Sequence, residues 1–400
     1  MKILMICGYF APENEAEVIQ HAKRAVEFSA NEFQKKLIRG LRGLDAQVEV
    51  LSAPFIGSWP NASDIRVFRG FRDAQEECQY VAFHNAWGLR NFSRAAALKK
   101  AVRTFAEDPA EDKLILVYCA HTPFLQAAEY AKKLDPRIRV CFYVPDLPNY
   151  MNLNADRSRL YDIAKGLDNA QMRRHMACMD SYVLLTEPMR DCLPVAEKPC
   201  AIIEGILDRQ CLEQPMAAQE DDGLKYIVYT GKMNEKFGIP QLVQGFSLLP
   251  DPDCRLVLCG TGECMDKLHA AASQDSRILV LGQLPPAQAA QWQRRAAVLV
   301  NPRPDNEEYT KYSFPSKNVE YLLTGKPVVA CMLAGMPACY RDFLYGIGNG
   351  SPEEIAQALA AALEASPEEV GKKHAAFREY AREQLTADSI ARRIVEMTKS

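Results

Sequence analysis

Residues 224–263, LKYIVYTGKMNEKFGIPQLVQGFSLLPDPDCRLVLCGTGE, hold two short apolar runs separated by a glycine turn and a longer apolar-periodic segment. The two runs are rich in β-branched and aromatic residues, which predicts strands at 224–231 and 254–263. The segment 239–249 between them predicts a helix. Because two parallel strands need such a crossover connection, this stretch predicts a parallel sheet covered by helices.

The same alternation continues on both sides of this stretch. Downstream it predicts a helix at 316–325 and strands at 277–284, 297–302 and 327–331. Upstream it predicts helices at 29–44 and 127–134, with Ser29 and Asn31 as N-cap residues. Further strands are predicted at 2–8, 46–52, 113–119, 138–144, 180–186 and 200–205. We therefore expect an α/β protein with two facing Rossmann-like, doubly wound parallel-sheet domains and a ligand cleft between them.

Chain length and local composition set the expected domain boundaries. A chain of 400 residues exceeds one typical core, which favours two domains. The polar, irregular stretch 207–223 is typical of a linker. We place an N-terminal domain at 1–205 and a C-terminal domain at 206–384, and we expect 352–400 to be helical and charged.

The bulk composition excludes several classes of protein. A net charge of -3 argues against a dedicated nucleic-acid binder. The 13 cysteines include no CxxC pair, which favours free thiols in a reducing compartment. The N-terminal MKILMICGYFAPENE indicates a first buried strand rather than a signal peptide. No apolar run reaches the roughly 18 residues that a membrane-spanning helix needs. Because free thiols favour a reducing cytoplasm, we expect a cytoplasmic protein.

Two glycine-containing turns after predicted strands are candidate binding loops. In YTGKMNEKFGI (229–239), Lys232 and Lys236 are suited to a diphosphate, although solvated loop lysines are the alternative. In LCGTGE (258–263), Gly260 and Gly262 allow close approach of a ligand or of a neighbouring backbone. This loop lacks the third glycine and the later acidic residue of a dinucleotide fingerprint, which disfavours a dehydrogenase.

Three further segments place polar residues at predicted strand or helix ends. In SFPSKNVEYL (313–322), Ser316 is the expected N-cap, the helix N-terminus could bind an anion, and Glu320 could accept ribose hydroxyls. A well-capped helix is the alternative. His121 follows the strand 113–119 and Asp146 follows the strand 138–144; a structural histidine and a turn-forming aspartate are the alternatives.

Together these segments resemble the retaining GT-B glycosyltransferases of the family-four type, the glycosyl transferases group 1. The resemblance covers essentially the whole chain and is strongest at 229–239 and at 301–329, NPRPDNEEYTKYSFPSKNVEYLLTGKPVV. It implies that Lys232 and Lys236 hold the donor diphosphate and, with His121, serve catalysis. It further implies a donor-binding set of Gly231, Lys232, Lys236, Gly260, Gly282, Tyr312, Ser313, Ser316, Lys317 and Glu320. The implied acceptor side comprises Gly8, Ser29, Asn31 and Asp146, and the tail from about 385 is expected to return to the first domain.

The reaction implied by the resemblance is transfer of a sugar from a nucleotide-sugar, with retention. A UDP-hexose donor, a glycan or lipid-linked acceptor and a role in surface polysaccharide or glycoconjugate synthesis are expected. Lysines and a helix N-terminus can stabilise a departing diphosphate without a metal, so neither metal nor cofactor is expected. The aromatic and basic residues between 84 and 103 form either a contact with the inner face of a membrane or a solvated amphipathic helix.

Two departures from the family pattern keep alternatives open. The usual pair of glutamates would place its first member at Tyr312, which is not a carboxylate. The first loop, APENEAEV (11–18), lacks a Gly-Gly pair, which indicates an unusual acceptor or a movable loop. A nucleotide-sugar 2-epimerase of the same architecture and a catalytically inactive partner subunit are the alternative functions.

Overall fold

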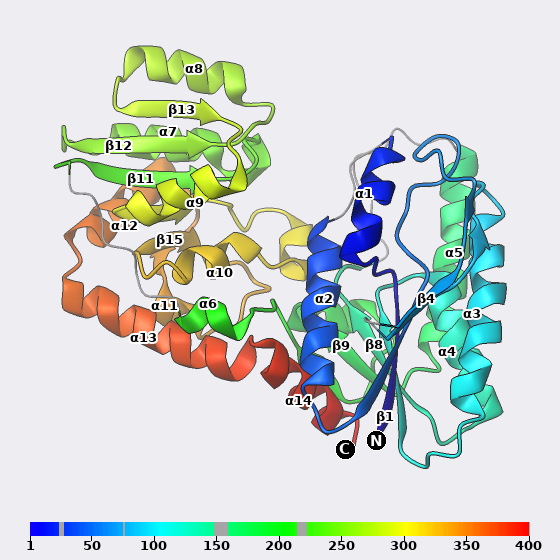
Figure 1. Cartoon of the computed structure of the whole chain (residues 1–400). Coiled ribbons are helices and arrows are strands. Elements are labelled where there is room, and N and C mark those ends of the chain that lie inside the picture. The colour runs from blue at the N-terminus through cyan, green and yellow to red at the C-terminus, as the bar shows by residue number, and fades with distance from the viewer. Residues whose placement is uncertain (24–27, 75–76, 148–158, 214–221, 400) are drawn as a thin grey trace. The chain divides into compact units, whose positions relative to one another are not determined.

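The computed structural model describes residues 1–23, 28–74, 77–147, 159–213 and 222–399 and divides into two compact units (Figure 1). The first unit combines Met1–Asp208 with Gln384–Ser400, and the second is Arg209–Glu383. None of the described helices is long and apolar enough to cross a membrane.

The first unit is built on an eight-stranded sheet of order β10-β9-β8-β7-β1-β2-β5-β4. The paired strands are parallel except for β4 and β5, which are antiparallel at one edge. Strand β7 is buried at every position, as expected for a parallel sheet covered on both faces. The strands are β1 (Lys2–Cys7), β2 (Gln47–Ser52), β4 (Phe71–Asp73), β5 (Cys78–Tyr80), β7 (Lys113–Tyr118), β8 (Arg139–Val144), β9 (Ser181–Leu184) and β10 (Cys200–Ile202). A separate two-stranded ladder joins β3 (Val67–Phe68) and β6 (Phe83–His84).

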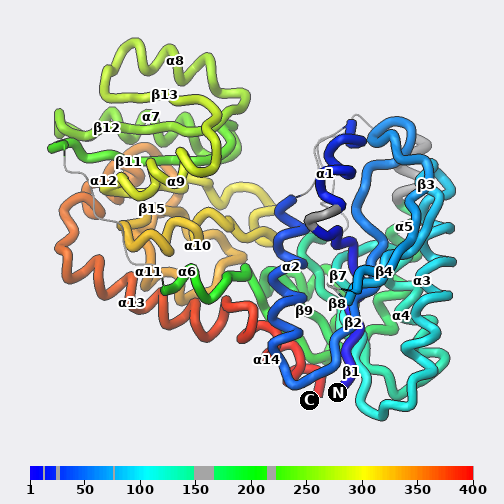
Figure 2. The backbone as a smooth tube through the Cα atoms, in the orientation of Figure 1, coloured from blue at the N-terminus to red at the C-terminus, as the bar shows by residue number. Residues whose placement is uncertain are grey.

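Helices flank this sheet, and one of them comes from the C-terminal end of the chain. They are α1 (Pro12–Gln20), α2 (Phe28–Arg42), α3 (Arg90–Ala106), α4 (Thr122–Leu134), α5 (Arg159–Met176), the 3-10 helix η1 (Glu187–Cys192) and α14 (Ala387–Met397). Helix α14 lies beside α2 (Figure 2), so close that a Cβ on Gly40 would be 2.2 Å from the Ala387 carbonyl oxygen. Arg393 also donates to the Ile202 carbonyl oxygen at 2.8 Å. These contacts attach the last helix to the first unit.

The second unit holds a six-stranded, fully parallel sheet of order β13-β12-β11-β14-β15-β16. This is the Rossmann strand order, in which the direction of winding reverses between the first and fourth strands, here β11 and β14. The strands are β11 (Lys225–Thr230), β12 (Cys254–Cys259), β13 (Ile278–Gly282), β14 (Val298–Asn301), β15 (Val328–Cys331) and β16 (Tyr345–Ile347). The predicted α/β class with two parallel sheets is therefore confirmed.

The connections of the second unit are helices of varied length. They are α6 (Arg209–Glu213), η2 (Glu235–Phe237), α7 (Ile239–Ser247), α8 (Met265–Gln274), α9 (Pro286–Arg295), η3 (Glu308–Tyr312), α10 (Ser316–Leu322), α11 (Tyr340–Phe343), α12 (Pro352–Glu364) and α13 (Pro367–Gln384). The helical tail predicted from 352 onward is confirmed by α12, α13 and α14. The predicted linker begins with helix α6, and its residues 214–221 lie outside the described residues.

Three expectations about local structure are wrong. Residues 11–18, expected as a loop, mostly form α1, because Pro12 occupies a first-turn position where its missing N–H costs nothing. Ser29 and Asn31 lie inside α2 rather than at its cap. Ser316 is the first helical residue of α10 and makes no side-chain cap, because the extended backbone of Pro315 already occupies the cap position.

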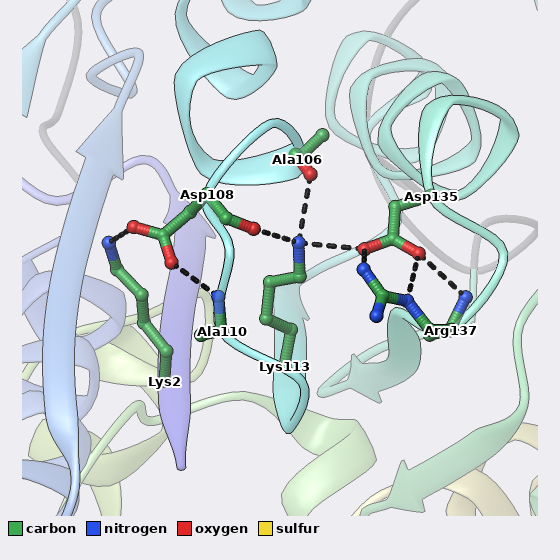
Figure 3. Close-up of polar contacts among 7 residues, drawn as sticks. All are labelled: Lys2, Ala106, Asp108, Ala110, Lys113, Asp135 and Arg137. Atoms are coloured by element: carbon green, nitrogen blue, oxygen red, sulfur yellow. Dashed lines mark hydrogen bonds and ion pairs between the residues drawn. The ribbon is translucent and has the colours of Figure 1, made fainter.

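A partly buried polar network lies at the amino-terminal ends of strands β1 and β7 of the first sheet (Figure 3). The fully buried Lys113 at the start of β7 reaches Asp135 Oδ2 at 2.7 Å and donates to two backbone carbonyl oxygens at 2.8 Å. Arg137 donates to both oxygens of Asp135, at 2.9 and 3.1 Å. Lys2 at the start of β1 pairs with Asp108 at 2.6 Å. Every charge drawn in Figure 3 is thus compensated, and these strand ends are structural.

Candidate functional site

The winding reversal of the second unit marks the candidate site. In open α/β sheets, ligands bind beyond the carboxyl ends of the strands at such a reversal. Here those ends carry Gly231 and Lys232 after β11, and Pro302 and Arg303 after β14. The segments that follow β11 and β14 are in close contact at Gly238, where an added Cβ would lie 2.3 Å from the Pro302 carbonyl oxygen. Gly238 also has a φ of 75°, which favours glycine.

Three cations lie on these segments without a carboxylate partner among the described residues. Lys232 and Lys236 are exposed, and Arg303 is half-buried. Lys236 Nζ is 5.5 Å from the centre of the Phe237 ring, and the Arg303 guanidinium is 5.7 Å from the same ring. The ring of Phe237 thus contacts two positive charges. Uncompensated cations at the carboxyl ends of neighbouring strands are suited to a bound polyanion.

Arg303 was missed by the sequence reasoning, although the signal was present in NPRP, directly after a predicted strand. Its Nη2 donates to Ser313 Oγ at 2.8 Å, which connects the loop after β14 to the segment before α10. The ring of Tyr309 lies 5.2 Å from its guanidinium. Arg303 is therefore held by neutral groups, and its charge is left for a ligand.

Glu320, in α10, is tethered to the end of β11 through Gln293. Glu320 Oε1 accepts a hydrogen bond from Gln293 Nε2 at 2.7 Å, and Oε2 lies 2.9 Å from Lys317 Nζ. The same Gln293 nitrogen donates to Thr230 Oγ1 at 2.9 Å. Because Gln293 is buried in α9, it can hold the exposed Glu320 carboxylate in one place. Nothing in the spacing of Gln293 pointed to this role.

Tyr321 fixes the backbone at the same strand end. Its hydroxyl accepts from the Thr230 amide at 2.8 Å and donates to the Thr230 carbonyl at 3.2 Å. Burial raises the pKa of Tyr321 well above its usual value, so the hydroxyl stays protonated. Two successive residues of α10 are thus bonded to the end of β11. Tyr321 bonds the Thr230 backbone directly, and Glu320 is linked to the Thr230 side chain through Gln293.

The glycines after β11, β12 and β13 divide into two kinds. Gly260 has a φ of 148°, and a Cβ there would lie 1.8 Å from the Gly231 carbonyl oxygen, while its amide donates to Gly282 at 2.7 Å. Close approach of neighbouring backbone therefore accounts for Gly260, which was one of the two alternatives. The Cβ position of Gly282 meets nothing within 4 Å, which leaves open space beside the end of β13.

The remaining predicted donor residues surround α10. Tyr312 ends η3 and is half-buried, and Ser313 follows it as the partner of Arg303. Ser316 is exposed at the start of α10, and Lys317 is half-buried. Helix α10 has only seven residues, so its aligned dipoles are few and we assign no anion to its amides.

In the first unit, His121 lies at the carboxyl end of β7 against a buried arginine. Its Nε2 is 3.4 Å from Arg94 Nη1, and its ring packs on Phe124 with the centroids 4.6 Å apart. Burial, then the charges of Arg94 and Arg90, lower the pKa of His121 well below its usual value. The imidazole is therefore neutral at pH 7, and its Nδ1 has no partner among the described residues.

One predicted acceptor-side residue, Asn31, and one residue that was not predicted, Gln34, hold the backbone after β1. The Asn31 side chain accepts from the Phe10 amide and donates to the Phe10 carbonyl, both at 3.0 Å. Gln34, which sequence reasoning missed, accepts from the Gly8 amide at 3.0 Å. Ser29 is exposed at the start of α2, and Asp146 is exposed after β8. Asn31 is thus committed to the loop, whereas Ser29 and Asp146 present polar groups at the surface.

Comparison with known proteins gives one family match, within the second unit. Residues 224–365 match the family model of the glycosyl transferases group 1. Among curated protein sequences, no match to this chain was found.

Solved structures similar over the whole chain include several glycosyltransferases. The HepE protein of Anabaena in complex with UDP is 14% identical with a TM-score of 0.61, and each chain is covered to 100%. The lipopolysaccharide outer core galactosyltransferase WaaB is 12% identical with a TM-score of 0.61, covering 100% of this chain and 99% of that one. OtsA, in its apo form, is 12% identical with a TM-score of 0.64 and the same coverage. The chain therefore has the GT-B fold, and its residues 224–365 are similar to the glycosyl transferases group 1.

Proposed function

We propose that this protein is a retaining glycosyltransferase that moves a hexosyl group from a UDP-sugar to a glycan or lipid-linked acceptor. The observation that carries the proposal is the arrangement after β11 and β14. There, three cations without a carboxylate partner among the described residues, Lys232, Lys236 and Arg303, lie near the tethered carboxylate of Glu320. Solved structures of this fold with UDP or with UDP-2-fluoro glucose support the choice of UDP.

Donor binding divides between the cations and the carboxylate. The diphosphate lies against Lys232, Lys236 and Arg303, which stabilise the negative charge that grows on the leaving oxygen. The ribose hydroxyls donate to Glu320, whose two oxygens offer about four acceptor positions while Gln293 and Lys317 occupy two. We therefore expect transfer to continue in the presence of a metal chelator.

Retention follows from attack on the face from which the diphosphate departs. The bond from the anomeric carbon to the phosphate oxygen breaks, and a bond to the acceptor oxygen forms on the same face. The departing phosphate oxygen takes the acceptor proton, so no protein nucleophile is needed. Tyr312, where the family pattern has a carboxylate, is compatible with this scheme because a tyrosine can position the sugar without forming a glycosyl intermediate.

Calorimetry with UDP-, GDP- and ADP-sugars tests the donor site. The expected result is binding of UDP-sugars to the wild type and at least about ten-fold weaker binding to Glu320→Ala, since a charged hydrogen bond is worth about 1.5–3 kcal/mol. Binding of no nucleotide-sugar, or equal binding to the variant, would contradict the proposal. The anomeric configuration of the product, read by NMR, tests retention.

Two alternatives make different predictions in the same experiments. A 2-epimerase would convert the donor without any acceptor, so product analysis in the absence of acceptor identifies it. An inactive partner subunit, which the position of Tyr312 favours, would bind a donor without turnover. We also propose that the protein acts in the cytoplasm, in the biosynthesis of a surface polysaccharide or glycoconjugate.

A further inference from the structure

The most exposed large apolar side chains of the described residues gather at one place in the first unit. Phe92, Trp87 and Leu167 are 78%, 70% and 69% exposed, and all three line a cavity of about 460 Å³. The cavity lies among α3, α4 and α5, which run side by side in Figure 2. Single exposed apolar residues are ordinary, but aromatic residues gathered around a cavity mark a binding surface.

Among the polar groups of this cavity, Thr122 and Arg90 are paired within the protein, whereas the buried Oδ1 of Asn91 has no partner among the described residues. Thr122 donates to Asp168 at 2.5 Å, and Arg90 donates to the Ile56 carbonyl oxygen at 3.3 Å. A polar ligand would have to replace these bonds, whereas an apolar one would cover the exposed rings. The exposed rings of Trp87 and Phe92 therefore make the mouth of this cavity suited to hydrocarbon.

A second cavity of about 240 Å³ shares Gln126 and Gln171 with the first. Its one lining carboxylate, Glu129, pairs with Lys133 at 2.6 Å and also with His175. The lining residues Lys99 and Arg174 then have no carboxylate partner among the described residues. An apolar cavity thus continues into a cationic one.

Helix α3 carries the same charge along its length. Its residues 90–106, RNFSRAAALKKAVRTFA, include five basic residues and no acidic one, and all of the five except the buried Arg94 reach the surface. A self-contact of this face would oppose its surface cations across a two-fold axis, which disfavours a second copy as the occupant. A partner with an anionic surface and an apolar interior matches both the cationic cavity and the apolar one.

We propose that the face formed by α3, α4 and α5 docks on an anionic lipid bilayer. Trp87, Phe92 and Leu167 enter the interface between head groups and acyl chains, and Lys99 and Arg174 contact lipid phosphates. This inference rests on the proposed function, because it makes the acceptor lipid-linked. The cavity includes Thr122, which directly follows His121, so a docked lipid brings its head group to the carboxyl end of β7.

Vesicle co-sedimentation of the full chain tests the proposal. Vesicles of phosphatidylcholine alone are compared with vesicles that also contain phosphatidylglycerol. We expect binding to the anionic vesicles only. A double variant Lys99→Gln/Arg174→Gln should bind about 25-fold more weakly, since each cation near an anionic surface contributes about five-fold. A double variant Trp87→Ser/Phe92→Ser should lose binding as well.

The matched controls lie outside this face. Leu248→Ser removes an apolar side chain that is 55% exposed in the second unit, and Lys35→Gln/Lys372→Gln removes two other cations. Both should bind vesicles as the wild type does. Equal loss in the controls, or full binding by the Trp87→Ser/Phe92→Ser variant, would overturn the docking surface.

Two further measurements distinguish a failure of the docking proposal from a failure of the proposed function. UDP calorimetry on the same variants should be unchanged, because all the substituted residues lie outside the donor site. If the wild type binds vesicles but no nucleotide-sugar, the proposed function fails while the docking surface stands. If light scattering shows a wild-type dimer that Trp87→Ser/Phe92→Ser separates, the face joins two copies and the lipid proposal is wrong.

Discussion

Arg94 Nη1 lies 3.4 Å from His121 Nε2, and the guanidinium of Arg94 is buried without a carboxylate partner among the described residues. Its Nη2 donates to the Pro54 carbonyl at 2.6 Å, and the Phe83 ring lies 4.2 Å away. Because a guanidinium can only donate, Nε2 must accept, and the imidazole proton lies on Nδ1. Arg94 therefore makes His121 a neutral donor at the carboxyl end of β7.

This pairing predicts how stability depends on pH. The pKa of His121 is lowered by folding, so the unfolded chain binds the proton more readily and stability falls as the pH drops below about 6.5. Arg94→Met should raise the pKa of His121 and flatten this dependence between pH 7 and 5. Thermal unfolding across that range checks it, with His121→Gln as the control. An imidazole that titrates near 6.5 in wild-type NMR spectra would contradict the pairing.

The cations after β11 and β14 predict a loss of activity without a loss of fold. Lys236→Ala and Arg303→Ala should each lower kcat/KM about 10- to 100-fold, because each removes a charged contact to phosphate. Steady-state kinetics and circular dichroism check both parts. Lys267→Ala is the matched control, since Lys267 is exposed nearby but paired with Glu235. Near-wild-type turnover of Lys236→Ala would remove that residue from the donor site.

Gln293 is predicted to act by positioning Glu320. Gln293→Ala frees the carboxylate and should weaken UDP binding about ten-fold, by the loss of roughly 1–1.5 kcal/mol of organised hydrogen bonding. Gln291→Ala, an exposed residue on the same helix α9, should bind UDP normally. Calorimetry measures both variants. An effect on KM for the donor that exceeds the effect on kcat separates positioning from a general loss of structure, which would lower both.

The Lys113–Asp135 pair predicts acid-sensitive stability of the first unit (Figure 3). Hydrogen bonds from Arg137 and Lys113 lower the pKa of Asp135 below its usual value. The stability they contribute is therefore present above about pH 4 and is lost as the pH falls below it. Lys113→Met should lower the melting temperature at pH 7 and leave UDP affinity unchanged, because β11 and β14 belong to the other unit. An unchanged melting temperature would show that the pair contributes nothing net.

The sequence by itself determined the strand and helix alternation, and therefore the two parallel sheets. It also located Lys232, Lys236 and Glu320 after β11 and in α10, because strand ends and glycine turns are local properties of the chain. Helix α1 could also have been predicted from the sequence, since Pro12 at a first-turn position is a local signal.

Only the tertiary structure decided which side chains meet. Gln293 reaches Thr230 across 63 residues of sequence, and Arg94 reaches His121 across 27. The predicted N-cap role of Asn31 was wrong for a related reason. Its side chain bonds to Phe10 from within α2, and helix propensity does not predict such a contact. Such contacts depend on how strands pair and helices pack, which no single stretch of residues specifies.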